Sequence, residues 1–467
     1  MLKPYDFQQE IIDRFKHESQ AAIFGDPGTG KTLMALNILR HKYNEHKQIL
    51  RTVIFCPSIV IENWKHEFSL NTKVDPIYIG CVQGTKKKRL QTLRNKNYKI
   101  LIINYEAMRT LDIKLALKDF SPLVAICDES HMIKSHKSQS FKNVKEVTLS
   151  SRYKMILTGT PYSKSAEDVW SQFYFLDHGA TFGSRFFPFK QRYFINLNQN
   201  WGSPNAFPNW QFNKSLLPEF KEKLSSKSVR VKKEDCLDLP DLVDVTINVE
   251  PTAEQKKHYK AIRDDLITFL ESAPNDPLVI KNALTKALRL NELLSGYLRL
   301  ESGEIELLKT VPKIDALMEI LDSLLPNKVI IFCTFKQNYA DISNCLENKK
   351  IDHVLIHGGI SGEQKIKNVD TFTKNKSCNV AIVNPKSGGV GINMKEAKYA
   401  VYFNCPYSLI DFEQSRARNY RAGSIDLHDK VTHYFLTHKG MIDEKIVAQL
   451  KSKKELAESI LDIKNLI

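Results

Sequence analysis

The sequence contains no long apolar run and no closely paired cysteines. None of its hydrophobic stretches approaches the roughly 18 residues of a membrane-spanning helix, and residues 1–6 do not resemble the start of a secretory signal. Its eight cysteines include no C-x-x-C pair, which argues against a zinc site or a disulfide framework. Cys56, Cys127 and Cys333 lie in apolar runs, where we expect reduced core residues. We therefore expect a soluble protein of the cytoplasm, or of the nucleus in a eukaryote, that is not secreted and has no membrane partner.

Length and charge favour a protein of several domains with an anionic partner. The 467 residues exceed the about 250–300 residues at which a single core stops growing, so we expect two or more domains. The composition is that of a globular protein, with 42% hydrophobic and 26% charged residues. The net charge of +15 is spread along the chain. Such an excess suits a polyanion such as nucleic acid, and a solubility surface would explain it equally well.

Residues 25–32, Gly-Asp-Pro-Gly-Thr-Gly-Lys-Thr, match the phosphate-loop pattern G-x-x-x-x-G-K-[ST]. The apolar run 21–24 predicts a strand before the loop and 33–39 predict a helix after it, which is the context that the pattern requires. Backbone N–H groups of such a loop point at the phosphates of a nucleotide, Lys31 would reach its β- and γ-phosphates, and the Thr32 hydroxyl would hold Mg²⁺. A glycine-rich turn before a helix is the alternative. The predicted nucleotide ligands of the loop are Gly25, Asp26, Pro27, Gly28, Thr29, Gly30, Lys31 and Thr32.

Two adjacent acids, Asp128 and Glu129, follow the apolar run 123–127. In a parallel sheet they would lie at the edge beside the phosphate loop. There Asp128 can bind Mg²⁺, and Glu129 can orient and deprotonate the attacking water. A chance pair of surface acids is the alternative. Upstream, Gln8 can read the adenine edge because an amide both donates and accepts hydrogen bonds, although most helix-surface glutamines are simply solvated.

Apolar runs alternate with polar, helix-like segments in both halves of the chain, which is the pattern of parallel sheets. The expected strands are 52–56, 77–79, 100–103, 123–127 and 154–157 in the first half, and 329–333, 353–357, 380–383, 399–403 and 431–436 in the second. Segments 251–272 and 278–300 are expected to be helices. The second half has no phosphate loop, so we do not expect an independent ATPase there.

The second half carries a glycine-rich loop, 384–394, and a basic segment, 414–423. The glycines permit close backbone approach to DNA phosphate and to nucleotide. Gln414, Arg418 and Arg421 are spaced to share one face of a helix. In the helicase family that these stretches resemble, such a face directs two guanidiniums across a cleft at the γ-phosphate, where an arginine typically accelerates hydrolysis by about 10³–10⁵-fold. A solvated basic helix is the alternative.

Together these stretches resemble the helicase motifs of superfamily 2, in its Swi/Snf-related branch, over residues 2 to 455. The resemblance is carried by Asn63-Trp64 with Glu67, Asn104-Tyr105-Glu106, 128–131 with Ile133-Lys134, 157–161, 167–170, 332–334, 357–359, 384–394, 414–423 and 440–446. It implies an α/β fold of two tandem RecA-like parallel-sheet lobes, with ATP in the cleft between them and with helical insertions. We expect lobe 1 at 1–235 with an aromatic and basic insertion at about 180–220, a linker and helical elements at 236–310, and lobe 2 at 311–467.

The resemblance also implies roles for individual residues. Nucleic-acid contacts are expected at Pro57, Ser58, Trp64, Asn104, Tyr105, Thr334, Gly358, Lys386, Ser387, Gly388 and Gly389. Thr158 and Thr160 would couple the ATP site to the nucleic acid, and Gly391 and Gln414 would contact nucleotide. Catalysis would rest on Glu129, Lys31, Arg418 and Arg421. Ser424, Asn384, Pro385 and Lys365 depart from the usual pattern of the branch and indicate a divergent member.

The expected function is that of a monomeric ATP-dependent translocase or helicase that acts on duplex or branched DNA without sequence preference. An RNA helicase or sensor of the same superfamily, and an ATP-gated nucleic-acid-binding module with little turnover, are the alternatives. The aromatic run 186–194, with Trp201, Phe207 and Trp210, could stack on bases. We favour a small protrusion that packs its own aromatic side chains.

Overall fold

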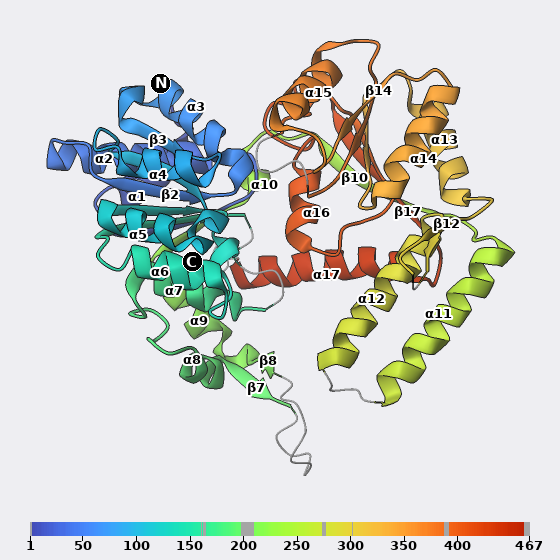
Figure 1. Ribbon diagram of the computed structural model, residues 1–467, viewed down its shortest axis with the longest axis horizontal. Helices are drawn as coiled ribbons and strands as arrows, with labels where there is room; N and C mark the ends of the chain where they lie inside the picture. The colour runs from blue at the N-terminus through green and yellow to red at the C-terminus, as the bar shows by residue number, and fades with distance from the viewer. Residues whose placement is uncertain are drawn as a thin grey trace.

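The protein, in a computed structural model, consists of two α/β lobes side by side (Figure 1). The structure describes residues 2–159, 161, 165–197, 210–272, 277–300, 302–386 and 392–461. We call the part built on the first sheet lobe 1 and the part built on the second sheet lobe 2. The C-terminal helix α17 (Ile442–Leu461) begins in lobe 2 and contacts α9 (Leu217–Ser225) of lobe 1.

Lobe 1 is built on a seven-stranded parallel sheet of order β3-β4-β2-β5-β6-β1-β9. Its strands are β1 (Gln20–Gly25), β2 (Thr52–Cys56), β3 (Ile79–Val82), β4 (Ile100–Asn104), β5 (Val124–Asp128), β6 (Tyr153–Thr158) and β9 (Ser228–Val231). The strand expected at 77–79 is displaced, because residues 76–78 form a 3₁₀ turn that Asp75 caps by accepting from the Ile77 N–H at 2.9 Å. Strand β9 was not predicted.

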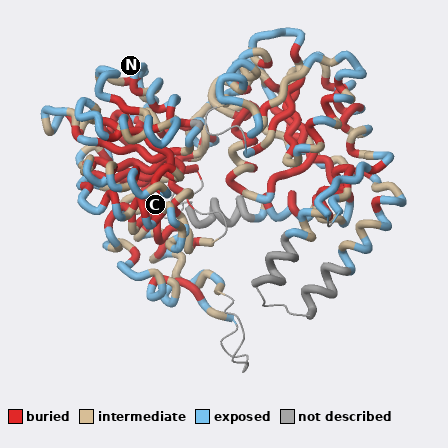
Figure 2. The backbone as a smooth tube through the Cα atoms, viewed as in Figure 1, coloured by how far each residue is buried: buried red, intermediate tan, exposed pale blue. Residues whose placement is uncertain are grey.

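Helices cover both faces of this sheet, so its central strands are buried on two sides. Side chains alternate between the two cores: Ala22 and Phe24 pack into one, and Ala21 and Ile23 into the other. Buried residues are concentrated accordingly along the two sheets (Figure 2). The helices of lobe 1 are α1 (Asp6–Phe15), α2 (Lys31–His46), α3 (Ile61–Asn71), α4 (Lys86–Arg94), α5 (Leu111–Phe120), α6 (Gln139–Val147), α7 (Asp168–Asp177), α8 (Phe186–Tyr193) and α9.

Lobe 2 is built on a six-stranded parallel sheet of order β10-β17-β16-β13-β15-β14. Its strands are β10 (Asp241–Asn248), β13 (Val329–Phe332), β14 (His353–Ile356), β15 (Val380–Val383), β16 (Tyr399–Tyr402) and β17 (Lys430–Thr437). Strand β10 lies in the range expected to be linker and helices. It pairs with β17 over its whole length, from Asp241 opposite Lys430 to Asn248 opposite Thr437. The short helix α10 (Lys233–Cys236) connects β9 to β10 and so joins the two sheets.

The helices of lobe 2 are α11 (Ala253–Ser272), α12 (Pro277–Leu294), α13 (Pro312–Leu324), α14 (Lys336–Asn348), α15 (Gly362–Lys374), α16 (Leu409–Arg416) and α17. Helices α11 and α12 contact each other and project from the lobe as a hairpin (Figure 1). The segment expected to be a helix at 278–300 ends earlier, because β11 (Tyr297–Arg299) pairs antiparallel with β12 (Ile305–Leu307). In the described residues, no helix has the length and apolarity that crossing a bilayer requires.

The aromatic insertion of lobe 1 packs against itself, as the favoured alternative predicted for its described residues. It contains α8, β7 (Phe194–Asn196) and β8 (Trp210–Phe212). The rings of Phe182, Phe189, Tyr193 and Phe220 form tilted and edge-to-face pairs at centroid distances of 5.1–6.5 Å. Trp201 and Phe207 lie outside the described residues.

Candidate functional site

A cavity of about 350 Å³ lies between the two lobes and collects most of the predicted nucleotide ligands. The predicted residues that line it are Gln8, Pro27, Gly28, Gly30, Lys31, Thr32, Asp128, Glu129, Gln414, Arg418 and Arg421. Gly25, Asp26 and Thr29 belong to the phosphate loop without lining the cavity, and Gly391 lies outside the described residues. The carboxyl ends of β1 and β5 supply the lobe 1 side, as expected at the edge of a parallel sheet.

The phosphate loop connects β1 to α2 through two glycines with left-handed backbone. Gly28 has φ +92° and Gly30, the residue before the helix, has φ +80°, a region that favours glycine. The Lys31 ammonium is buried and donates to the Gly25 carbonyl at 2.7 Å. The loop therefore holds Lys31 at the helix N-terminus, the end that favours an anion.

Gln8 reaches the phosphate loop from α1 and is only 3% exposed. Its amide nitrogen donates to the Thr29 carbonyl at 2.9 Å, and its amide oxygen accepts from the Tyr5 N–H at 3.0 Å. An amide has two N–H groups and two pairs of acceptor electrons, so these bonds leave capacity for a ligand. The structure thus places Gln8 at the cavity and gives it a structural role in supporting the loop.

The Asp128 carboxylate is held by two hydrogen bonds from the protein. The Trp64 indole N–H donates to Oδ2 at 2.8 Å, and the Glu129 backbone N–H donates to Oδ1 at 2.9 Å. Burial, together with the neighbouring negative charge of Glu129, raises the pKa of Asp128 to about 6, against the opposing effects of the Trp64 bond and of Lys31. Two of the roughly four acceptor sites of a carboxylate are thereby occupied, which leaves sites for a further ligand.

Trp64, Asn104 and Tyr105 were predicted to contact nucleic acid, and the structure buries the side chains of all three. Trp64 and Tyr105 are 0% exposed and Asn104 is 7% exposed, so their side chains have almost no surface to offer a polymer. The Tyr105 hydroxyl donates to the Asp128 carbonyl at 2.7 Å. Trp64 and Tyr105 therefore support the strand end that carries Asp128, one through its carboxylate and the other through its backbone.

Glu129 occupies a turn with left-handed backbone, φ +50°, and its carboxylate is buried. His131 Nδ1 lies 3.1 Å from Glu129 Oε2 and 3.4 Å from Thr158 Oγ1. Burial opposes ionisation of Glu129, but the bond from His131 and the charges of His131 and Lys31 outweigh it and hold the pKa of Glu129 below its usual value. Thr158 and Thr160 were predicted to couple the ATP site to the nucleic acid. Thr158 is buried at the end of β6, beside His131, and Thr160 lies outside the described residues.

Arg418 and Arg421 reach the cavity from lobe 2, but not from the helix that their spacing predicted. Helix α16 ends at Arg416, because the following backbone turns away and the Arg418 carbonyl accepts from the Met394 N–H at 2.9 Å. The Arg418 guanidinium is 4% exposed and donates to the Pro385 carbonyl at 2.7 Å. Burial lowers the pKa of Arg418 to about 10 and also lowers the pKa of Arg421, and both still carry a proton at neutral pH.

The remaining predicted nucleic-acid contacts lie beyond the carboxyl ends of strands in both lobes. In lobe 1 these are Pro57 and Ser58, after β2. In lobe 2 they are Thr334, Gly358 and Lys386, after β13, β14 and β15. Ser58, Gly358 and Lys386 are exposed and Pro57 and Thr334 are half-buried. Ser387, Gly388 and Gly389 lie outside the described residues.

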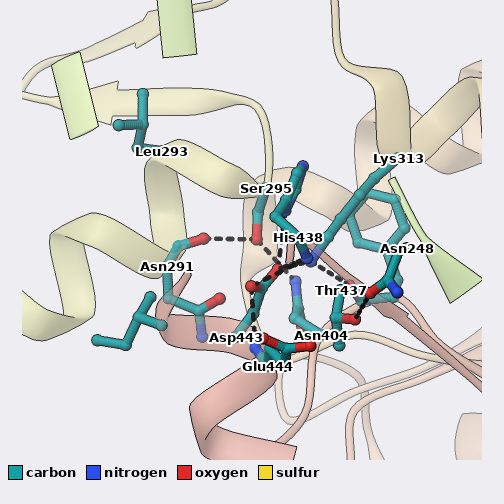
Figure 3. A network of polar contacts seen from close by, with 12 residues as sticks. Asn248, Asn291, Leu293, Ser295, Lys313, Asn404, Thr437, His438, Asp443 and Glu444 are labelled. Carbon is teal, nitrogen blue, oxygen red and sulfur yellow. Dashed lines mark hydrogen bonds and ion pairs between the residues drawn. The ribbon is translucent and has the colours of Figure 1, made fainter. Parts of the chain in front are cut away.

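A buried polar network around Asn404 and Asp443 lies at one edge of lobe 2 (Figure 3). Asn404 accepts from the Thr334 backbone N–H at 2.5 Å and from its hydroxyl, and donates to Ser295 Oγ at 3.2 Å. Beside it, Asp443 at the start of α17 accepts from Lys313 and from His438, each at 2.8 Å. The network ties α12, α13 and α17 to the sheet edge and so fixes the position of Thr334.

Several cavity residues were not predicted as ligands, among them Tyr5, Val60, Asn63, Glu67 and Ile392. Val60, Asn63 and Glu67 are three and four positions apart at the start of and along α3, so helical periodicity places them on one face. This spacing in the sequence could have indicated that the three residues share a face. It could not indicate that the face points at the cavity, which requires the position of at least one of them in the fold.

A phosphate loop and adjacent acids from one parallel sheet, with arginines from a second sheet across one cavity, define a two-lobed P-loop ATPase. A family model described as SNF2-related domain matches residues 11–299, and one described as helicase conserved C-terminal domain matches residues 312–423. The chain belongs to the SNF2-related family of superfamily 2 helicases, which use ATP, as the resemblance predicted.

Relatives in several organisms are similar to most of this chain. An uncharacterized ATP-dependent helicase, MG018, of Mycoplasma genitalium is 27% identical over 93% of this chain and 39% of its own length. The chromodomain-helicase-DNA-binding protein 1-like of Danio rerio is 25% identical, over 99% and 44%. The DNA repair and recombination protein RDH54 of Saccharomyces cerevisiae is 24% identical, over 97% and 52%. The chain thus spans about half, or less, of the length of these relatives.

Among solved structures, a Sulfolobus solfataricus SWI2/SNF2 ATPase core in complex with double-stranded DNA is 23% identical to the chain. The match covers 98% of this chain and 94% of that one, with a TM-score of 0.45. A second structure, of the Sulfolobus solfataricus SWI2/SNF2 ATPase core domain, is 23% identical and matches with a TM-score of 0.42.

Proposed function

We propose that this chain hydrolyses ATP with Mg²⁺ and uses the reaction to move along duplex or branched DNA and remodel it, by fork regression, branch migration or protein displacement. The observation that supports this function is the divided cavity, with Lys31, Asp128 and Glu129 on one lobe and Arg421 on the other. A divided site makes hydrolysis depend on lobe closure. Repeated closing and opening would step two DNA-gripping surfaces along a backbone.

Within this proposal each lobe contributes different groups. Lys31 binds phosphate oxygens at the helix N-terminus, Glu129 orients the attacking water, and Arg421 stabilises charge on the transferring phosphoryl group. The exposed residues at both sheet edges contact phosphates, so that binding is largely independent of sequence. The net charge of +15 favours such a partner, and two relatives are named for DNA binding or DNA repair.

The donor set at the cavity fits Mg²⁺. The Asp128 carboxylate and the Thr32 hydroxyl line it, and hard oxygen ligands are those that Mg²⁺ takes in phosphate-transfer sites. When bound, the ion neutralises charge on the phosphates. Asp128 and Thr32 would hold it, with Trp64 fixing the orientation of the Asp128 carboxylate.

Trp64→Phe is expected to weaken Mg²⁺ binding by about 10–100-fold, the usual cost of removing a hydrogen bond behind a metal ligand. Phenylalanine keeps one of the two fused rings of the buried indole and lacks the N–H that donates to Asp128 Oδ2, and the same truncation at Trp170 controls for the lost volume. The measurement is the Mg²⁺ dependence of binding of a fluorescent ATP analogue, with the ATPase rate alongside. Trp170→Phe is the matched control, since the Trp170 indole donates to the Gly183 carbonyl at 3.1 Å, outside the cavity. Equal Mg²⁺ dependence in both variants would remove Trp64 from this role.

The function is tested by the ATPase rate with fork, four-way-junction, duplex and single-stranded DNA and with RNA. We expect duplex or branched DNA to stimulate the rate most, and we expect stimulation to fall steeply with salt because phosphate contacts release counterions. Lys31→Ala serves as the control for contaminating ATPases. Strongest stimulation by RNA would favour the RNA helicase alternative. ATP-dependent DNA binding without turnover would favour the gated binding module.

A further inference from the structure

Lys233 contacts both lobes at the point where the chain crosses between them. It is the first residue of α10, the short helix between β9 of the lobe 1 sheet and β10 of the lobe 2 sheet. Its backbone N–H donates to Asp26 Oδ2 of the phosphate loop at 3.1 Å. Its ammonium donates to the Tyr420 carbonyl of lobe 2 at 3.3 Å and lies 4.1 Å from the centre of the Tyr420 ring.

On the lobe 1 side, the crossing segment is joined tightly to the phosphate loop. Arg230 Nη2 lies 2.6 Å from Asp26 Oδ1, and its Nη1 donates to the Phe24 carbonyl at 3.0 Å. The Asp26 N–H donates to the Val231 carbonyl at 3.0 Å. Burial disfavours the Asp26 carboxylate, but the charges of Arg230 and Lys233 outweigh it and lower the pKa of Asp26. A shift of the phosphate loop is therefore transmitted to the backbone of Lys233.

On the lobe 2 side, Lys233 contacts Tyr420, the residue that directly precedes the candidate catalytic residue Arg421. Tyr420 is 6% exposed and directly precedes Arg421, which lines the cavity. The Arg421 backbone also lies close to the phosphate loop, since a Cβ placed on Gly28 would be 3.7 Å from the Arg421 Cβ. Fixing Tyr420 therefore fixes where the Arg421 side chain begins.

The contact between the Lys233 ammonium and Tyr420 is of a kind that can form and break repeatedly, and we call it the latch. The Lys233 side chain is 4% exposed, and an ammonium removed from water needs compensating contacts. The Tyr420 carbonyl oxygen and the face of the Tyr420 ring, both of lobe 2, provide such contacts while the lobes are together. When the lobes separate, water solvates the ammonium, so opening the contact is not prohibitively costly.

We propose that Lys233 is a positioning residue that holds the Arg421 segment against the phosphate loop in the closed state. It links the loop, through Asp26, to the lobe that supplies the arginine, through Tyr420. The proposal rests on the proposed function, in which Arg421 acts on ATP bound at the phosphate loop. Lys233 itself does not line the cavity, so its effect on the reaction is indirect.

Lys233→Met tests the proposal because methionine keeps the length and apolar packing of the side chain and removes its charge. We expect the kcat of ATP hydrolysis to fall about 5–30-fold, the range that loss of a buried cation–π contact produces, with the KM for ATP unchanged. Tyr420→Leu, which removes the ring, should give the same loss. Tyr420→Phe is the matched control: it keeps the ring and the carbonyl and should behave as wild type.

Two further measurements distinguish a latch from a general loss of structure. In a double-mutant cycle, Lys233→Met with Tyr420→Leu should lower kcat hardly more than Lys233→Met alone, because the ring of Tyr420 acts through the Lys233 ammonium. Fluorescence energy transfer between dyes on α4 and α15 should report a smaller closed fraction in both single variants with a nonhydrolysable ATP analogue. Additive losses, or unchanged energy transfer, would contradict the latch.

Failure of the proposed role of Lys233 can be distinguished from failure of the proposed function. A wild-type chain with no ATP hydrolysis would remove the proposed function, whatever Lys233 does. An active wild type with Lys233→Met at the same kcat would remove the latch alone. A raised KM with unchanged kcat would assign Lys233 to nucleotide binding through Asp26 and would also overturn the proposal. If Lys233→Met does not fold, the comparison of Tyr420→Leu with Tyr420→Phe decides.

Discussion

Arg421→Ala is expected to lower the kcat of DNA-stimulated ATP hydrolysis by about 10³–10⁵-fold, the range for an arginine that stabilises a transferring phosphoryl group. Arg421 reaches the interlobe cavity from lobe 2. Its guanidinium makes only a long hydrogen bond within the described residues, from Nη1 to the Ile392 carbonyl at 3.5 Å. The guanidinium is therefore available to a ligand. Because the charge it stabilises develops mainly in the transition state, the KM for ATP should change far less than kcat.

Two comparisons make this prediction specific. Arg421→Lys keeps the charge but not the planar fork, so we expect it to recover only part of the rate. Arg185→Ala removes an exposed arginine of lobe 1 and should leave the rate unchanged. Arg418→Ala would be harder to interpret, because the Arg418 guanidinium donates to the Pro385 carbonyl at 2.7 Å and its loss would disturb that loop. A rate for Arg421→Ala within tenfold of wild type would remove Arg421 from the transition state.

The elements that could be predicted from the sequence are those whose signal is continuous along the chain. Strands such as β2, β5 and β15 are buried on both faces and appear as uninterrupted apolar runs. Strand β10 was missed because it lies at a sheet edge and alternates exposed and half-buried residues. Strand β9 is short and carries Arg230, whose charge is neutralised by Asp26, more than 200 positions away.

The residues of the candidate site divide in the same way. The phosphate loop and the Asp128–Glu129 pair could be predicted because each is local and follows an apolar strand. The bonds of Trp64 and Tyr105 to Asp128 were not predicted, since polar aromatic residues after a strand are as compatible with a surface contact as with a buried bond. Only the order of the strands, which places β2 between β4 and β5, distinguishes the two.

Arg418 and Arg421 show a third situation, in which the correct location was predicted for an incorrect reason. Helical spacing placed them on one face with Gln414, but the helix ends at Arg416. The backbone beyond it is held by a bond from the Met394 N–H to the Arg418 carbonyl. Because Met394 is adjacent only in the folded lobe, no local pattern could indicate the turn.

Glu129→Gln is expected to preserve ATP binding and to lower kcat by about 10²–10⁴-fold, the usual contribution of a general base. The substitution keeps the shape of the side chain and removes its negative charge. His131 Nδ1 lies 3.1 Å from Glu129 Oε2, and His131 and Lys31 keep the pKa of Glu129 low. The carboxylate is thus ionised throughout the neutral range, the state in which it would orient the attacking water and accept its proton.

The low pKa of Glu129 determines the expected pH dependence of the wild-type rate. Since Glu129 remains ionised well below neutral pH, the wild-type rate should not fall with protonation of Glu129 between about pH 6 and 8. Binding of a fluorescent ATP analogue measures affinity separately from turnover, and Glu146→Gln changes an exposed glutamate that pairs with Lys114 at 2.9 Å as the control. If Glu129→Gln turned over ATP at a rate near that of wild type, orientation of water by Asp128, Arg421 and the phosphate loop would suffice. Loss of binding together with turnover would instead assign Glu129 to the structure of the phosphate site, through the turn that it shares with Asp128.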